Sequence, residues 1–232
     1  MKKEILDQIE KYQHIIWDWN GTILDDIDIS IQTINEILPL YDLPTVSKDR
    51  YHLLFRFPLI EYYKDLGFNF NKGAEGTLKE SFAVVGDQFI EKYKSRVLQS
   101  KLFDGMIDIF SNIKDIKKSL TPKKQSILSA ASEKHLLQLI KHFDVYDYFD
   151  HIHGIDNHYA TSKLQRGFDL LKVSGIAAKD SLLIGDTEHD YDVAKDLGVN
   201  FLLLGDGHQN LGPLKLKLGS ESESKNIFDS RY

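Results

Sequence analysis

HIIWDWNGTILDD, residues 14–26, is the stretch that decides the fold expected of this chain. It begins with an apolar run over 14–17, which is typical of a buried parallel strand. Asn20-Gly21 then indicates a turn, because both residues tolerate positive φ. Asp18 therefore stands at the carboxyl end of a strand, where ligands bind in open α/β sheets. The alternative is an aspartate that only caps a strand–loop junction, and the rest of the chain has to distinguish the two.

Composition and charge exclude several classes of function. The chain has 232 residues and a net charge of −6, which argues against a nucleic-acid-binding surface. It contains no cysteine, so disulfides, thiolate catalysis and cysteine metal sites are excluded. Acidic residues fall within the first ten positions, unlike a signal peptide, and no apolar run approaches the roughly 20 residues that span a bilayer. We expect a cytoplasmic protein that binds neither nucleic acid nor membrane.

The order of the expected elements predicts an α/β fold with a helical insertion. Apolar residues at helical spacing dominate 25–100, which predicts an inserted α-helical cap domain. The flanking segments, 1–24 and 101–232, are predicted to form one α/β core domain. Its fold class is a Rossmann-like, parallel, five-stranded sheet between helices. The expected strands are 13–17, 125–129, 151–154, 181–185 and 200–204.

Several polar residues follow these strands and would meet at one edge of the sheet. Asp186 and Asp190 lie four residues apart across a strand-to-helix turn, and together with Asp18 they suit Mg²⁺. The alternative is a helix whose N-terminal acids only complement its dipole. Ser129 and Ala130 precede a helix that Ser132 can cap, a position that favours anion binding.

These residues resemble the haloacid-dehalogenase-like superfamily, specifically its phosphoglycolate-phosphatase-like members with an α-helical cap. The family's first motif, Asp-x-Asp-Gly-Thr after a hydrophobic strand, corresponds to residues 18–22 with one departure. Its second motif falls on Ser129, and its lysine falls most plausibly on Lys163. Its Gly-Asp-x-x-x-Asp motif is complete at residues 185–190. The resemblance covers nearly the whole chain.

The resemblance implies Mg²⁺-dependent hydrolysis of a small phosphorylated metabolite. Asp18 would attack phosphorus and form an aspartyl-phosphate. Asp18, the backbone carbonyl of Asn20 and Asp186 would bind Mg²⁺, and Asp190 would orient metal-bound water. Ser129, Lys163 and the loop N–H groups around Ala130 would neutralise the charge on the phosphoryl group.

The departure is Asn20, which stands where the family has an acid–base aspartate, and an amide cannot transfer that proton at neutral pH. Three interpretations are open. His189 or Glu188 replaces the aspartate; the substrate has a leaving group that needs little protonation; or the protein is slow, or binds a phospho-ligand without catalysis. Cleavage of a phosphonate carbon–phosphorus bond is a further alternative, and it would require a cap lysine such as Lys64 or Lys72.

Four other side chains have weaker predicted roles. Arg56, in the helical insertion, is a candidate for binding a substrate carboxylate or second phosphate. A solvated arginine is at least as good an interpretation. His208 follows the fifth strand, and we interpret it as a histidine of a surface loop. Trp17 and Trp19 flank Asp18, and strand alternation predicts that both pack in the core.

Overall fold

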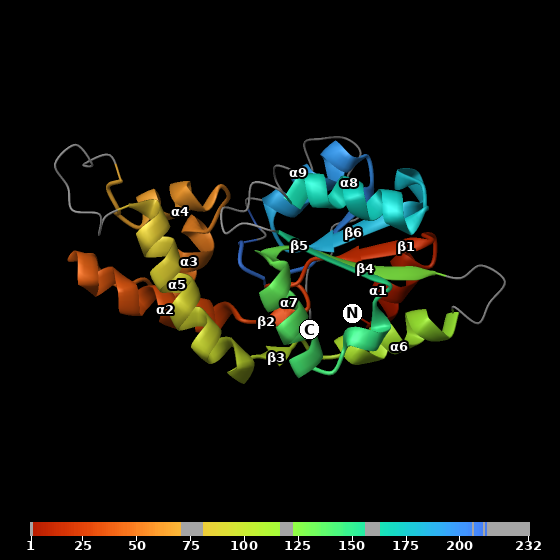
Figure 1. The fold of residues 1–232 in the computed structure, drawn as a ribbon, viewed down its shortest axis with the longest axis horizontal. Helices are drawn as coiled ribbons and strands as arrows, with labels where there is room; N and C mark the ends of the chain where they lie inside the picture. Colours follow the sequence, from red (N-terminus) through yellow and green to blue (C-terminus); the bar gives the residue numbers. More distant parts are fainter. Residues whose placement is uncertain are drawn as a thin grey trace.

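Five parallel strands form the central sheet, in the order β5-β4-β1-β6-β7 (Figure 1). The computed structural model describes residues 2–70, 81–116, 123–155, 163–205, 207–210 and 212. The fold class predicted from the sequence is confirmed, and all five expected strands are present. Their bounds are β1 (His14–Trp17), β4 (Lys124–Ser132), β5 (His151–Ile155), β6 (Ser181–Gly185) and β7 (Asn200–Leu203).

Helices cover both faces of this sheet (Figure 1). One face carries α8 (Lys163–Ser174) and α9 (Glu188–Leu197), and the other carries α1 (Lys2–Ile9), α6 (Met106–Ile116) and α7 (Glu133–His142). Short 3-10 helices at Tyr146–Tyr148 and Ala178–Asp180 lie in the connections. None of the helices in the described ranges has the length and apolarity needed to span a membrane.

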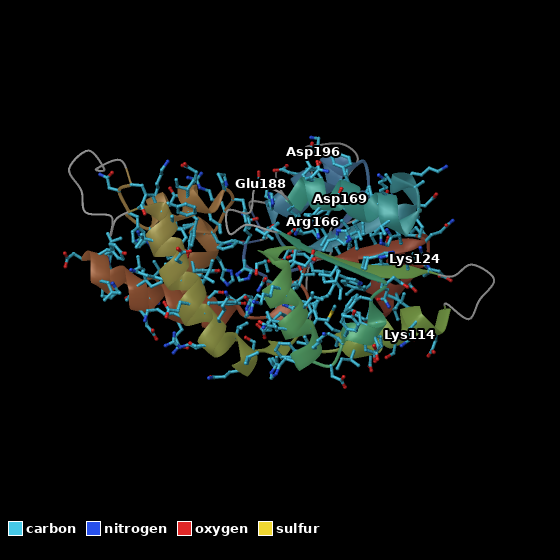
Figure 2. The ribbon with its side chains drawn as sticks, in the orientation of Figure 1. Lys114, Lys124, Arg166, Asp169, Glu188 and Asp196 are labelled. Carbon is cyan, nitrogen blue, oxygen red and sulfur yellow. The ribbon has the colours of Figure 1, made fainter. Side chains whose placement is uncertain are left out.

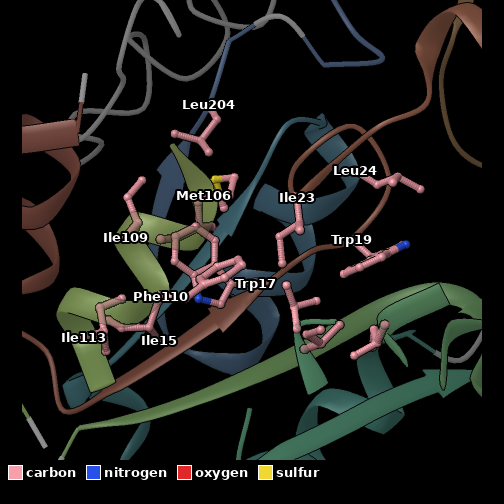
Figure 3. Close-up of a cluster of buried hydrophobic side chains, with 14 of the residues drawn as sticks. Ile15, Trp17, Trp19, Ile23, Leu24, Met106, Ile109, Phe110, Ile113 and Leu204 are labelled. Atoms are coloured by element: carbon pink, nitrogen blue, oxygen red, sulfur yellow. The ribbon is translucent and has the colours of Figure 1, made fainter. Parts of the chain in front are cut away.

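Successive side chains of β1 point to opposite faces of the sheet and so enter different apolar clusters. Ile16 packs among the buried residues beneath α8 and α9, whereas Ile15 and Trp17 enter the larger cluster on the other face (Figure 3). Trp17 contacts Phe110 edge to face, with ring centroids 5.5 Å apart. Trp19 is also fully buried. The predicted packing role of both tryptophans is confirmed, and these two large side chains anchor the backbone on either side of Asp18.

The helices between the first and second strands of the sheet form a separate layer with its own apolar cluster. Its elements are α2 (Ile27–Ile37), α3 (Lys48–Leu54), α4 (Leu59–Asp65) and α5 (Phe82–Arg96), with 3-10 turns at Leu38–Tyr41 and Val97–Gln99. We call this layer the cap. Two short strands that the sequence analysis missed, β2 (Leu24–Asp25) and β3 (Lys101–Leu102), pair antiparallel where the chain enters and leaves it. Two-residue strands show no periodicity, so only tertiary pairing reveals them. The domain division at 25 and 100 stays a prediction.

The burial of Trp17 predicts a large contribution to stability. We expect Trp17→Ala to lower the free energy of unfolding by about 3–5 kcal/mol, because it removes a fully buried ring and leaves a cavity. Urea denaturation followed by circular dichroism measures this change. Leu53→Ala is the control, because that side chain is 68% exposed and its loss should change stability by less than about 0.5 kcal/mol. A loss below about 1 kcal/mol for Trp17→Ala would contradict the expectation.

Candidate active site

Three carboxylates meet at the carboxyl edge of the sheet. Asp18 follows β1, Asp186 follows β6, and Asp190 lies in the first turn of α9. The register between β1 and β6 pairs Trp17 with Ile184, and the backbone N–H of Asp18 donates to the carbonyl of Ile184 at 2.9 Å. One oxygen from each carboxylate lies within 4.8 Å of the others, and all three side chains are buried. The convergence predicted from the order of the strands is therefore present.

Lys163, the first residue of α8, reaches into this acidic cluster. Its Nζ donates to Oδ1 of Asp18 and to Oδ1 of Asp190, both at 2.6 Å, and only 2% of its side chain is exposed. A cation at a helix N-terminus is unfavourable unless anionic partners compensate it, and these two carboxylates do so. They raise the pKa of Lys163 despite its burial, so the ammonium stays charged.

The site carries more negative charge than one lysine can balance. Burial, opposed by Lys163, raises the pKa of Asp18 to about 8, and burial also raises the pKa of Asp186. Asp190 differs, because contact with Lys163 and Thr187 outweighs its burial and lowers its pKa. Three oxygen ligands with uncompensated charge are what a hard divalent cation such as Mg²⁺ prefers. The donor set therefore fits Mg²⁺.

Hydrogen bonds hold the carboxylates of Asp186 and Asp190 in place. Asp186 accepts from the hydroxyl of Thr22 and from the backbone N–H of His208, both at 2.7 Å. Asp190 accepts from the hydroxyl of Thr187 at 2.6 Å and closes a capping box at the start of α9. Gly21 has a φ of +69°, and a Cβ there would lie 2.5 Å from Oδ2 of Asp186. A glycine is therefore needed for the turn to approach the carboxylate so closely.

Ser129 stands on β4 beside the acidic cluster. It is 1% exposed, and its hydroxyl accepts from the backbone N–H of Ala131 at 3.1 Å. The strand continues to Ser132, beyond its predicted end, and Ser132 then caps α7 by accepting from the N–H of His135 at 3.4 Å. Ser129 and Ala130 line the same cavity as Asp18 and Lys163. The structure thus brings Ser129 and Ala130, two of the predicted phosphate-contacting positions, to the site.

The amide of Asn20 is engaged by the cap and by the chain entering it. Its Nδ2 donates to Oδ2 of Asp26 at 2.9 Å and to the hydroxyl of Tyr93, on α5, at 2.7 Å. Tyr93 in turn donates to Oδ2 of Asp26 at 2.6 Å. The position two residues after Asp18 therefore faces a buried carboxylate. An amide donor satisfies that environment, and a second carboxylate would not.

His208 is a buried partner of Asp26, so its interpretation as a surface-loop histidine is wrong. Its side chain is 7% exposed, its Nε2 lies 3.3 Å from Oδ1 of Asp26, and its ring stacks on Phe55 with centroids 4.9 Å apart. Burial opposes the charged imidazole, but Asp26 raises the pKa of His208 to about 9. The same ion pair lowers the pKa of Asp26 against the effect of burial. The loop after β7 carries no periodic signal, so the sequence did not reveal this pair.

A cavity of about 220 Å³ lies between the cap and the acidic cluster. Asp18, Ser129 and Lys163 line its core side, and His189 lines it while stacking on Phe57 with centroids 4.4 Å apart. Burial lowers the pKa of His189. The other proposed proton carrier, Glu188, is not among the lining residues.

Two of the predicted cap cations lie outside the lining of this cavity. Nε of Arg56 contacts Asp65 at 2.8 Å, and its side chain is 49% exposed. Lys64 contacts Glu61 at 2.7 Å at the surface. Neither residue lines the cavity, and Lys72 lies outside the described residues. The structure therefore does not bring Arg56 to Asp18 as a substrate-reading group.

Comparisons with known proteins agree with this arrangement. A family model described as haloacid dehalogenase-like hydrolase matches residues 15–204. A haloacid dehalogenase-like hydrolase from Streptococcus pneumoniae is similar in structure, with a TM-score of 0.73, 16% identity, and coverage of 96% of this chain and 95% of the other. A predicted phosphatase from Clostridium acetobutylicum has a TM-score of 0.73, 17% identity and 94% coverage of both chains. A predicted phosphoglycolate phosphatase from Haemophilus somnus has a TM-score of 0.72, 17% identity and 94% coverage of both. No curated protein gives a significant match.

The contact between Asn20 and Asp26 predicts that Asn20→Asp is destabilising. We expect a loss of about 1–3 kcal/mol in the free energy of unfolding, because two carboxylates would then face each other in a buried site. Urea denaturation at neutral pH measures it, and Asn210→Asp at an exposed position is the matched control.

Asp26→Asn and Asn20→Asp together form a double-mutant cycle. Combining the two substitutions restores an amide–carboxylate pair, so the double variant should be more stable than additivity predicts by at least about 1 kcal/mol. Strictly additive losses would show that the two side chains do not interact.

Proposed function

The chain belongs to the haloacid dehalogenase-like hydrolase family, and we propose that it hydrolyses phosphoric esters or anhydrides of small molecules with Asp18 as nucleophile. One observation carries the proposal: the carboxylate of Asp18 contacts buried Lys163 within an acidic cluster, and both residues line the cavity beneath the cap. A carboxylate in this place can meet a phosphoryl group that enters the cavity while Lys163 offsets the negative charge.

The reaction takes two displacements. An oxygen of Asp18 attacks phosphorus, the bond from phosphorus to the leaving oxygen breaks, and an aspartyl-phosphate forms. Water then attacks that phosphorus, the bond to Asp18 breaks, and inorganic phosphate leaves. Lys163 and the hydroxyl of Ser129 stabilise negative charge on the phosphoryl oxygens in both steps.

Asp18, the backbone carbonyl of Asn20 and Asp186 would hold Mg²⁺, with Asp190 beside them. When bound, the ion supplies positive charge that keeps Asp18 ionised and offsets the charge of the phosphoryl group. Thr22 and the backbone of His208 fix Asp186 for this role through their hydrogen bonds.

Asn20 affects how the leaving oxygen is protonated. Its amide is held by Asp26 and Tyr93 and transfers no proton. His189 lines the cavity, but burial lowers its pKa and so disfavours the protonated form that could act as an acid. The leaving oxygen then takes its proton from water after the bond has broken, and substrates with stable leaving anions are favoured. Phosphonate cleavage gains no support from Lys64, which is ion-paired at the surface.

Removing the nucleophile or the metal should abolish activity. We expect wild-type protein with Mg²⁺ to hydrolyse acetyl phosphate or 4-nitrophenyl phosphate, and Asp18→Asn to lower kcat at least about 1,000-fold. Phosphate release measures both, and excess EDTA should remove the wild-type rate. Asp28→Asn is the control, because Asp28 is an exposed residue of the cap. Full activity of Asp18→Asn would exclude the mechanism, and phosphate binding without any hydrolysis would indicate a non-catalytic phospho-ligand-binding protein.

The absence of a carboxyl group at position 20 predicts a strong dependence on the leaving group. We expect kcat for acetyl phosphate to exceed kcat for ethyl phosphate by at least about 100-fold, the size of a lost general-acid contribution. Peptide mass spectrometry must show an intact Asn20-Gly21 in the assayed sample, because deamidation would introduce an aspartate. Equal rates for the two substrates would mean that another group delivers the proton.

A further inference from the structure

The cap side of the cavity is built from aromatic and aliphatic side chains. It is lined by Phe55, Phe57, Leu59, Tyr62, Phe89 and Ile90, which come from the ends and inner faces of α3, α4 and α5. Several of their rings pack against one another, as in the contact between Phe55 and Tyr62 with centroids 5.3 Å apart. The leaving group of a phosphate ester bound at Asp18 would lie against these rings.

Cations in the described part of the cap are poorly placed to bind a second anionic group. Arg56 is held at the surface by Asp65 and is absent from the lining. Lys94 is the cap cation that does line the cavity, and its side chain is exposed, where solvent screens its charge. On the core side, Lys114 and Lys124 lie at the end of the molecule away from the cap (Figure 2).

The charges inside the cavity also disfavour a negatively charged leaving group. Asp26 lines it as a buried carboxylate, and its ion-pair partner His208 is committed to it at 3.3 Å. Lys163 is already shared between Asp18 and Asp190. A carboxylate on the leaving group would lie close to the buried carboxylate of Asp26, and among the described cap residues only the exposed Lys94 offers a cation in the lining, which makes its burial costly. An uncharged ring would instead gain apolar burial and aromatic contacts.

We propose that the substrates of this site are phosphate esters whose leaving group is uncharged and aromatic or bulky and apolar, rather than carboxylated esters such as 2-phosphoglycolate. This inference rests on the proposed function, because it assumes that the phosphoryl group binds at Asp18. The proposal assigns selection of the leaving group to the cap side chains around Leu59 and Phe89, and not to Arg56, the candidate that the sequence offered.

Binding to a non-hydrolysing variant tests the inference separately from turnover. Asp18→Asn with Mg²⁺ is titrated calorimetrically with inorganic phosphate, with 2-phenylethyl phosphate and with the phosphate ester of 3-hydroxypropanoate. Both esters release primary alcohols. They differ chiefly because one leaving group carries a phenyl ring and the other carries a carboxylate. We expect the phenylethyl ester to bind at least about 30-fold more tightly. Equal or tighter binding of the carboxylated ester, or no binding of the phenylethyl ester, would overturn the inference.

A matched pair of cap variants locates the effect. Leu59→Lys introduces a cation into the cavity lining and should reduce the preference for the phenylethyl ester at least about tenfold. Leu53→Lys adds the same charge to the cap at an exposed position outside the lining and should leave the preference unchanged. Equal effects of the two variants would contradict selection by the cavity.

The phosphate titration separates the two proposals. Binding of inorganic phosphate together with a reversed ester preference would refute the substrate class and leave the proposed function intact. Failure of inorganic phosphate to bind would refute both.

Discussion

The buried ammonium of Lys163 lies between the carboxylates of Asp18 and Asp190, and the arrangement of the edge of the sheet depends on this contact. Each partner alone would be a charge removed from water at a large free-energy cost. Together they connect the end of β1, the start of α8 and the start of α9, because Nζ of Lys163 lies 2.6 Å from an oxygen of each carboxylate. The compensation is incomplete, because Asp186 adds a further buried carboxylate. That residual charge makes the edge suitable for a divalent cation and for phosphate together, rather than for either alone.

Asn20 is better understood from its neighbours than from its place in the motif. A carboxylate at this position would face Asp26, which is already buried and paired with His208. The amide instead donates to Asp26 and to Tyr93 and so links the loop after β1 to α5 of the cap. The chain therefore has a buried negative charge near the site, but it is placed on Asp26 and committed to an ion pair. In the proposed mechanism, the leaving group therefore departs without help from position 20.

The side chains of the cap bear on which substrate we propose for this site. Sequence reasoning offered Arg56 as a candidate for binding a substrate anion, beside an equally good interpretation as a solvated arginine, and the structure directs its guanidinium to Asp65 at the surface. The cap side of the cavity is formed mainly by rings and aliphatic chains. The resemblance to phosphoglycolate-phosphatase-like proteins therefore accounts for the fold and for the residues at the edge of the sheet, whereas the specificity that we propose follows from the cap. The same core can serve different esters because the cap supplies a separate set of contacts.

The sequence by itself determined the sheet and the groups at its edge. Asp18, Ser129 and Asp186 each follow or end a strongly apolar run, and parallel connections must bring such positions together. The sequence also predicted Lys163, mainly through the order of the motifs. The tertiary structure alone decided the pairing of Asp26 with His208, which are 182 positions apart, and the two-residue ribbon of β2 and β3. It also decided which cap side chains face the cavity. Local patterns encode burial and periodicity, but they contain no information about which helix face meets which loop once a cap folds over a core.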